Sequence, residues 1–179
     1  MQLKFSDELL KILEYSGNEA LRTGSLGIGV DHLMLGIIRH GRNEAVAALK
    51  ESGISPEELK KEIDAAVFSD KAVAYSELKN IKATRPAKSV ISMAAFEALK
   101  NGGQEVFARH LLLAISLTNG NVSAESLLRR GATHEKLAGI LSSRQKTEAG
   151  QIKFQDIAGA LSEQLGNILG SSGYDGFLN

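Results

Sequence analysis

One sequence unit is written twice in this chain of 179 residues, and that repeat limits the fold more than any other feature. The string His32-Leu33-Met34-Leu35-Gly36-Ile37 recurs 78 residues later as His110-Leu111-Leu112-Leu113-Ala114-Ile115. Further apolar residues and glycines coincide at the same offset without gaps: Leu13 with Ile91, Ala20 with Ala98, Leu21 with Leu99, Gly24 with Gly102, Leu49 with Leu127, Gly53 with Gly131, and Leu59 with Leu137. A fixed offset shared by both kinds of position predicts two copies of one structural unit.

Each copy is predicted to form four short helices, because apolar residues recur at three- and four-residue spacing and a glycine or a polar cluster follows each stretch. The first helix is expected from Asp7 to Arg22, with Ser6 as its N-cap. The string Ser55-Pro56 predicts an N-cap and an N1 proline for the fourth helix. Helices this short are marginal in isolation, so we expect their stability to come from a shared core.

The chain divides into four segments on this basis: a first repeat at 1–67, a linker at 68–86, a second repeat at 87–142 and a C-terminal tail at 143–179. The linker loses the helical period and ends at Pro86, which favours an extended residue before it. One apolar stripe in the tail predicts an amphipathic helix at 154–169, which would pack on its own domain, mediate self-association or dock in a partner's groove. The predicted fold class is therefore all-α, a pseudo-twofold tandem of two four-helix repeats plus a C-terminal amphipathic helix.

Charge and composition argue against several classes of partner. Lys plus Arg and Asp plus Glu number 21 each, so the chain lacks the basic excess typical of proteins that bind nucleic acids or membrane surfaces. No apolar stretch approaches 18 residues, so we expect no membrane span. The N-terminus begins an amphipathic pattern without the features of a secretory signal, and there is no cysteine. These observations favour a cytoplasmic protein.

We find no sequence pattern that would support catalysis or hold a cofactor. The four histidines lack metal-ligand spacing, and the glycines between Gly24 and Gly29 fit no nucleotide-binding pattern. A Gly-x-x-x-x-Gly-Lys-Ser/Thr phosphate loop and a Gly-x-Ser-x-Gly elbow are both missing from the sequence. We therefore expect a protein that is not an enzyme, with no metal and no cofactor, in which His32 and His110 are structural residues near helix starts.

The doubled His-Leu-Leu-Leu-Gly-like signature resembles the Clp N-terminal (Clp repeat) domain of the Clp-family AAA+ unfoldases, over residues 1 to about 142. The resemblance implies a docking module whose partners are Clp unfoldase or protease subunits, adaptors and substrate proteins. Because the phosphate loop is missing, this polypeptide is not expected to unfold proteins itself.

In some members of this family, a Glu immediately before the signature His holds the guanidinium of an arginine-phosphorylated protein, and a nearby Thr and a helix N-terminus take the phosphate. Those positions are Asp31, which keeps the charge and has Ser6 at the Thr position, and Arg109, which reverses it although Thr84 remains. The resemblance thus implies at most one phosphoarginine site. The residues that the resemblance implies for partner binding are Ser6, Asp31, His32, Thr84, Arg109 and His110.

Three hypotheses follow. The leading one is a non-catalytic docking protein that uses surfaces flanking Asp31 and Arg109, so that charge reversal at Asp31 weakens partner capture. The alternative is an N-terminal fragment of an ATP-dependent Clp unfoldase, whose unfolding activity resides in absent domains. The third is a small-molecule sensor that uses the groove between the repeats.

Overall fold

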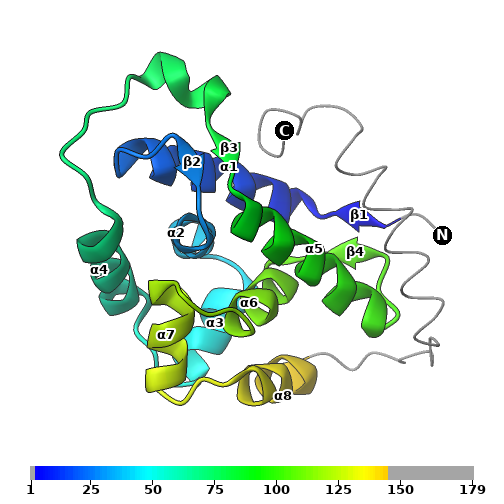
Figure 1. Cartoon of the computed structure of the whole chain (residues 1–179). Helices are drawn as coiled ribbons and strands as arrows, with labels where there is room; N and C mark the ends of the chain where they lie inside the picture. The colour runs from blue at the N-terminus through cyan, green and yellow to red at the C-terminus, as the bar shows by residue number, and fades with distance from the viewer. Residues whose placement is uncertain (1–2, 145–179) are drawn as a thin grey trace.

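The computed structural model describes residues 3–144, and α-helices make up most of this part of the chain (Figure 1). The helices are α1 (Asp7–Arg22), α2 (Val30–His40), α3 (Glu44–Glu51) and α4 (Pro56–Val67) in the first repeat, and α5 (Arg85–Lys100), α6 (Ala108–Ser116), α7 (Val122–Arg129) and α8 (His134–Arg144) in the second. A 3-10 helix, η1, covers Tyr75–Asn80. The all-α prediction is confirmed for the described residues, and the predicted helix at 154–169 lies outside them.

Local capping explains where the helices begin. The Ser6 hydroxyl accepts a hydrogen bond from the Leu9 N–H at 3.0 Å, so α1 starts where the sequence predicted. The side chains of Asn43 and Asn121 cap α3 and α7 at equivalent positions of the two repeats. Because these caps depend on single side chains close in sequence, the sequence alone could predict most helix starts.

The linker is shorter than predicted, because α5 begins at Arg85 and not after Pro86. Thr84 is the extended N-cap residue, and Pro86 lies in the first helical turn, where its missing N–H leaves no hydrogen bond unmade. Gly24 lets the linker run close to the end of α1: its φ is 79°, and a Cβ there would lie 2.9 Å from the Ser69 carbonyl oxygen. Only glycine fits this position without strain.

Four two-residue strands, which the sequence did not predict, join the two repeats. They are β1 (Lys4–Phe5), β2 (Gly27–Ile28), β3 (Lys82–Ala83) and β4 (Glu105–Val106). Strand β1 of the first repeat pairs in parallel with β4 of the second, and β2 pairs in the same way with β3. These two pairs are equivalent at the 78-residue offset, so the pseudo-twofold relation extends to the backbone.

Both repeats share one hydrophobic core. Helix α2 lies near the centre of the molecule (Figure 1) and contacts α1, α3 and α4 of its own repeat and α5, α6 and α7 of the other. The signature leucines Leu33 and Leu111 are fully buried. Each such side chain stabilises the fold by roughly 1.5–3 kcal/mol. The two repeats therefore form a single packed unit.

Candidate functional site

The six predicted site residues fall in two equivalent places, the starts of α2 and α6. His32 and His110 occupy the third position of these helices and are 6% and 4% exposed. The backbone N–H of Gly29 donates to His32 Nδ1 at 2.9 Å, and that of Phe107 donates to His110 Nδ1 at 3.0 Å. Each imidazole therefore takes the place of the Glu or Gln of a capping box.

Both histidines are held in the neutral form. Burial lowers the pKa of His32 below its ordinary value, and burial together with the Arg109 charge lowers the pKa of His110 to about 3. Because Nδ1 of each ring accepts a hydrogen bond, the single proton of the neutral ring resides on Nε2. Each ring therefore presents an uncharged N–H donor on the side away from its helix start.

The two Nε2 groups differ in their partners. His32 Nε2 lies 2.9 Å from Thr23 Oγ1, and the Thr23 hydroxyl donates in turn to the Glu19 carbonyl at 2.9 Å. The equivalent of Thr23 in the second repeat is Asn101, whose Nδ2 donates to the Glu97 carbonyl at 3.0 Å instead. Among the described residues, no side chain or carbonyl accepts from His110 Nε2. Within residues 3–144, only the first histidine therefore has a side-chain partner for its Nε2.

Asp31 stabilises the other repeat. Its carboxylate accepts hydrogen bonds from the Val122 N–H at 3.2 Å, the Ser123 N–H at 2.7 Å and the Ser123 hydroxyl at 2.6 Å. These donors belong to the first turn of α7, where a carboxylate also interacts favourably with the helix dipole. A guanidinium arriving at Asp31 would have to compete with these bonds.

Arg109 makes the equivalent cross-repeat contact with the opposite charge. Its guanidinium donates to the Glu44 carboxylate at 2.7 Å and lies 4.4 Å from the centre of the Phe107 ring. Glu44 opens α3 and is the repeat equivalent of Val122, which Asp31 caps. The charge reversal at Arg109 is therefore matched by a carboxylate on its partner helix.

The structure pairs Ser6 and Thr84 with the opposite helix starts from those assumed in the sequence. The Ser6 N–H donates to the Val106 carbonyl at 3.0 Å, which places Ser6 beside the start of α6 and Arg109. The Thr84 N–H donates to the Ile28 carbonyl at 2.9 Å, beside the start of α2 and Asp31. Strand pairing across the repeats causes this exchange.

Glu8 has a structural role that sequence reasoning missed. Its carboxylate accepts from the Ala108 N–H at 3.0 Å and so satisfies the start of α6. In the sequence, Glu8 has the pattern of an ordinary acidic first-turn residue. Its repeat equivalent is Pro86, which carries no acceptor at that place, so the two helix starts are chemically different.

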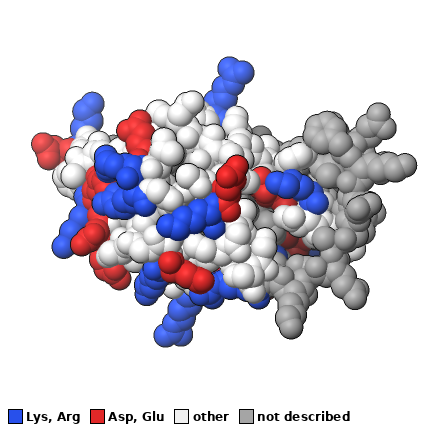
Figure 2. All heavy atoms as spheres, turned by 90° about the horizontal axis from the view of Figure 1, so that it is seen from below, with Lys and Arg blue, Asp and Glu red and all other residues white. Residues whose placement is uncertain are grey.

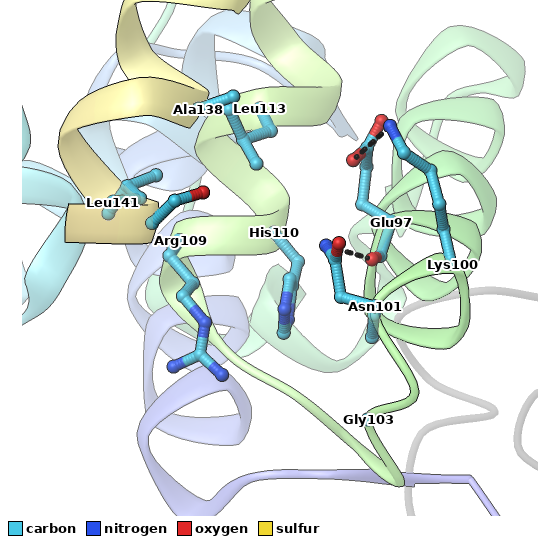
Figure 3. Close-up of a pocket in the computed structure, with 11 residues that line it drawn as sticks. Glu97, Lys100, Asn101, Gly103, Arg109, His110, Leu113, Ala138 and Leu141 are labelled. Atoms are coloured by element: carbon cyan, nitrogen blue, oxygen red, sulfur yellow. Dashed lines mark hydrogen bonds and ion pairs between the residues drawn. The ribbon is translucent and has the colours of Figure 1, made fainter. Parts of the chain in front are cut away.

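A pocket of about 430 Å³ opens beside His110, between α5, α6 and α8 (Figure 3). Arg109 and His110 lie side by side on α6, and Glu97 and Lys100 face them from α5 (Figure 3). The remaining walls are formed by Ala98, Asn101, Gly103, Leu113, Ala138, Leu141 and Ser142. Two differences between the repeats mark this pocket in the sequence: Asn101 in place of Thr23, and Ser142 in place of Asp64.

Charges outside this pocket are mixed. Figure 2 shows basic and acidic side chains interspersed over one face of the described chain, with uncoloured residues between them. Within residues 3–144 no group of three or more potential ligand side chains could hold a metal ion. No helix of that range is both long and apolar enough to cross a membrane.

Comparison with known proteins gives one consistent match. The family model described as the Clp repeat (R) N-terminal domain matches residues 4–130. The negative regulator of genetic competence ClpC/MecB from Bacillus subtilis is 31% identical over 133 residues, and the chaperone protein ClpB from Oceanobacillus iheyensis is 29% identical over 133 residues. Each match covers 74% of this chain but only 16% of the relative.

Solved structures support the same fold. The N-terminal domain of the caseinolytic protease associated chaperone ClpD from Arabidopsis thaliana superposes with a TM-score of 0.61 at 20% identity, covering 80% of this chain and 95% of that one. The Hsp104 N-terminal domain from Candida albicans gives a TM-score of 0.62 at 13% identity, covering 86% of this chain and 98% of that one.

Proposed function

The chain belongs to the family of Clp repeat N-terminal domains, and from that premise we propose that it is a non-catalytic docking module of the Clp chaperone and protease system. The observation that carries the proposal is that the family match and the shared core together account for most of the described residues. The partners we propose are Clp unfoldase or protease subunits, adaptors and substrate proteins, met in the cytoplasm.

The proposed docking surface flanks the start of α2. Here Leu26 is 62% exposed immediately before β2, and Arg85 is exposed at the start of α5, which β3 brings beside α2. At the start of α6, Glu8 and Arg109 are both engaged in hydrogen bonds within the chain. This difference favours one-sided docking at α2. Asp31 would support this surface through its bonds to α7. If phosphoarginine is recognised, we propose that it binds at the start of α2 and not at the start of α6.

Affinity capture from native lysate, read by mass spectrometry, tests the docking proposal. The unmodified chain should recover Clp unfoldase, protease or adaptor subunits, and Leu26→Ser should reduce that recovery. Leu128→Ser is the matched control, because Leu128 is 69% exposed near the end of α7 opposite the first turn that Asp31 contacts. If no Clp component is recovered, or if both variants behave alike, the proposed surface is wrong.

The chain spans only 16% of the length of the first two curated relatives, which motivates a second proposal. In that proposal, this domain is the N-terminal part of a longer ATP-dependent unfoldase, and the unfolding activity resides in domains outside this sequence. An open reading frame that continues past Asn179 into a phosphate-loop domain would support it.

Self-association through residues 154–169 remains part of the proposal, on the apolar stripe of the sequence alone. Sedimentation equilibrium of the full chain and of a chain that ends at Gly150 tests it. We expect the full chain to associate and the shortened chain to be monomeric. If the full chain and the shortened chain are both monomeric, or both associate to the same extent, self-association through residues 154–169 is wrong.

A further inference from the structure

The pocket beside His110 lacks two groups that fill the equivalent place in the first repeat. There, Thr23 accepts from His32 Nε2, and the Asp64 carboxylate pairs with the Arg22 guanidinium between α4 and α1. The residues 78 positions later are Asn101, which turns to a backbone carbonyl, and Ser142, which carries no charge. The side-chain contacts that Thr23 and Asp64 make in the first repeat therefore have no counterparts at Asn101 and Ser142.

Two donors in this pocket are left without the partners that their equivalents have. His110 is 4% exposed and lines the pocket, and no acceptor for its Nε2 N–H is found among the described residues. Lys100 is the equivalent of Arg22, but among residues 3–144 its ammonium contacts only Glu97, at 3.4 Å. Both donors line the same pocket, where a negatively charged acceptor would suit either of them.

The rest of the lining sets the shape and polarity of a ligand. Arg109 adds a second cation on the same side as His110. Glu97, the one acidic side chain among the described lining residues, already contacts both His134 and Lys100. Leu113, Ala138 and Leu141 form an apolar wall. A ligand that suits both parts has a carboxylate at one end and a compact aliphatic group at the other.

We propose that this pocket binds a carboxylate that carries a short aliphatic group, with the carboxylate on His110 Nε2 and Lys100 and the aliphatic group against α8. A peptide C-terminus that ends in an aliphatic residue and a free branched-chain acid share this chemistry. The site lies within the second repeat and not in the groove between the repeats. It goes beyond the docking function and does not depend on it.

The test is a titration followed by amide NMR shifts, with three probes: N-acetyl-leucine, N-acetyl-leucinamide and isovalerate. N-acetyl-leucine or isovalerate should give saturable shifts at the end of α5, the start of α6 and α8. N-acetyl-leucinamide should bind more weakly by a factor of about ten or more, because it lacks the charged acceptor. Binding of N-acetyl-leucine alone would identify a peptide C-terminus as the ligand, and binding of isovalerate as well would identify the free acid class.

A variant that copies the first repeat makes the test specific. The double substitution Asn101→Thr and Ser142→Asp supplies the acceptor and the carboxylate that the first repeat has, so it should remove binding while leaving the chain folded. Ser143→Asp makes the same chemical change at the neighbouring exposed position and should bind like the unmodified chain. Lys100→Gln, at a side chain that is 48% exposed, is a second variant in case the double variant does not fold, and it should weaken binding. The proposal is overturned if the acids give no saturable shifts, if the amide binds equally well, or if the folded variants bind unchanged.

Discussion

The Arg109 guanidinium lies 2.7 Å from the Glu44 carboxylate, although 65 residues separate them in the sequence. The pseudo-twofold relation maps this pair onto Asp31 and Val122, where a carboxylate caps α7. The two contacts hold the repeats together at equivalent places. The residue before the signature histidine is negatively charged in the first contact, Asp31, and positively charged in the second, Arg109. The residue before each signature histidine is therefore a cross-repeat contact in this chain.

Arg109→Glu should destabilise the fold, because it places two carboxylates together. Glu44 is 37% exposed, so solvent screening limits the effect to about 1 kcal/mol. Adding Glu44→Arg should recover most of that loss, since it restores an ion pair with the signs exchanged. Urea unfolding of the two single variants and the double variant measures the coupling. Additive losses would show that the pair contributes nothing.

Asp31→Ala should cost about 1–2 kcal/mol, the usual effect of removing a helix N-cap group. Asp31→Asn should cost less, because the amide oxygen can still accept from Ser123. Denaturant midpoints compare the two variants, with Asp70→Ala in the exposed linker as the control. A loss in the Asp70 variant as large as in Asp31→Ala would assign the effect to net charge and not to the cap.

The free energy of unfolding should fall as the pH drops below about 6.5. The pKa values of His32 and His110 are lowered in the folded chain, that of His110 to about 3, so the unfolded chain binds more protons between the folded and unfolded pKa values. Each histidine then contributes a slope of roughly 1 kcal/mol per pH unit, and its full stabilisation is present only above the unfolded pKa.

His110→Gln separates this effect from that of the carboxylates, because Gln can still accept from the Phe107 N–H in the capping box. Its stability should decline less steeply than that of the unmodified chain between pH 6 and about pH 4. His40→Gln removes a partly exposed histidine at the end of α2 and serves as the control. Parallel curves for the unmodified chain and His110→Gln would contradict the argument.

The sequence predicted those parts of the fold that depend on neighbouring residues. The helix from Asp7 to Arg22, its cap at Ser6 and the repeat of four helices follow from local spacing, and the structure has them at those places. The strand pairs could not be predicted, since two residues carry no alternating pattern. Without those pairs, nothing in the sequence places Ser6 beside Arg109 and not beside Asp31.

The pocket beside His110 could not be predicted from the sequence either. Comparing the repeats position by position reveals Asn101 against Thr23 and Ser142 against Asp64, but the sequence does not say that these four residues face a histidine or close a cavity. That information comes from the packing of α8 against α6 and from the contact between His134 on α8 and Glu97 on α5. A repeat alignment can therefore identify differences between two copies, while their chemical meaning depends on non-local contacts.

Gly36 is the position where the close packing of α1 against α2 allows no side chain. A Cβ there would overlap Ser16 Oγ and lie 2.6 Å from the Ile12 carbonyl oxygen. Gly36→Ala should therefore destabilise the chain by about 1–3 kcal/mol, despite the better helix propensity of alanine. Because the Ile12 oxygen is backbone, adding Ser16→Ala should recover only part of this loss. The second repeat has alanine at both equivalent positions, Ala114 and Ala94. The reverse change Ala114→Gly therefore tests the equivalent interface between α5 and α6, by leaving a small void there. Thermal melts of the four chains decide the matter: full recovery in the double variant would show that only the serine side chain limits the helix approach.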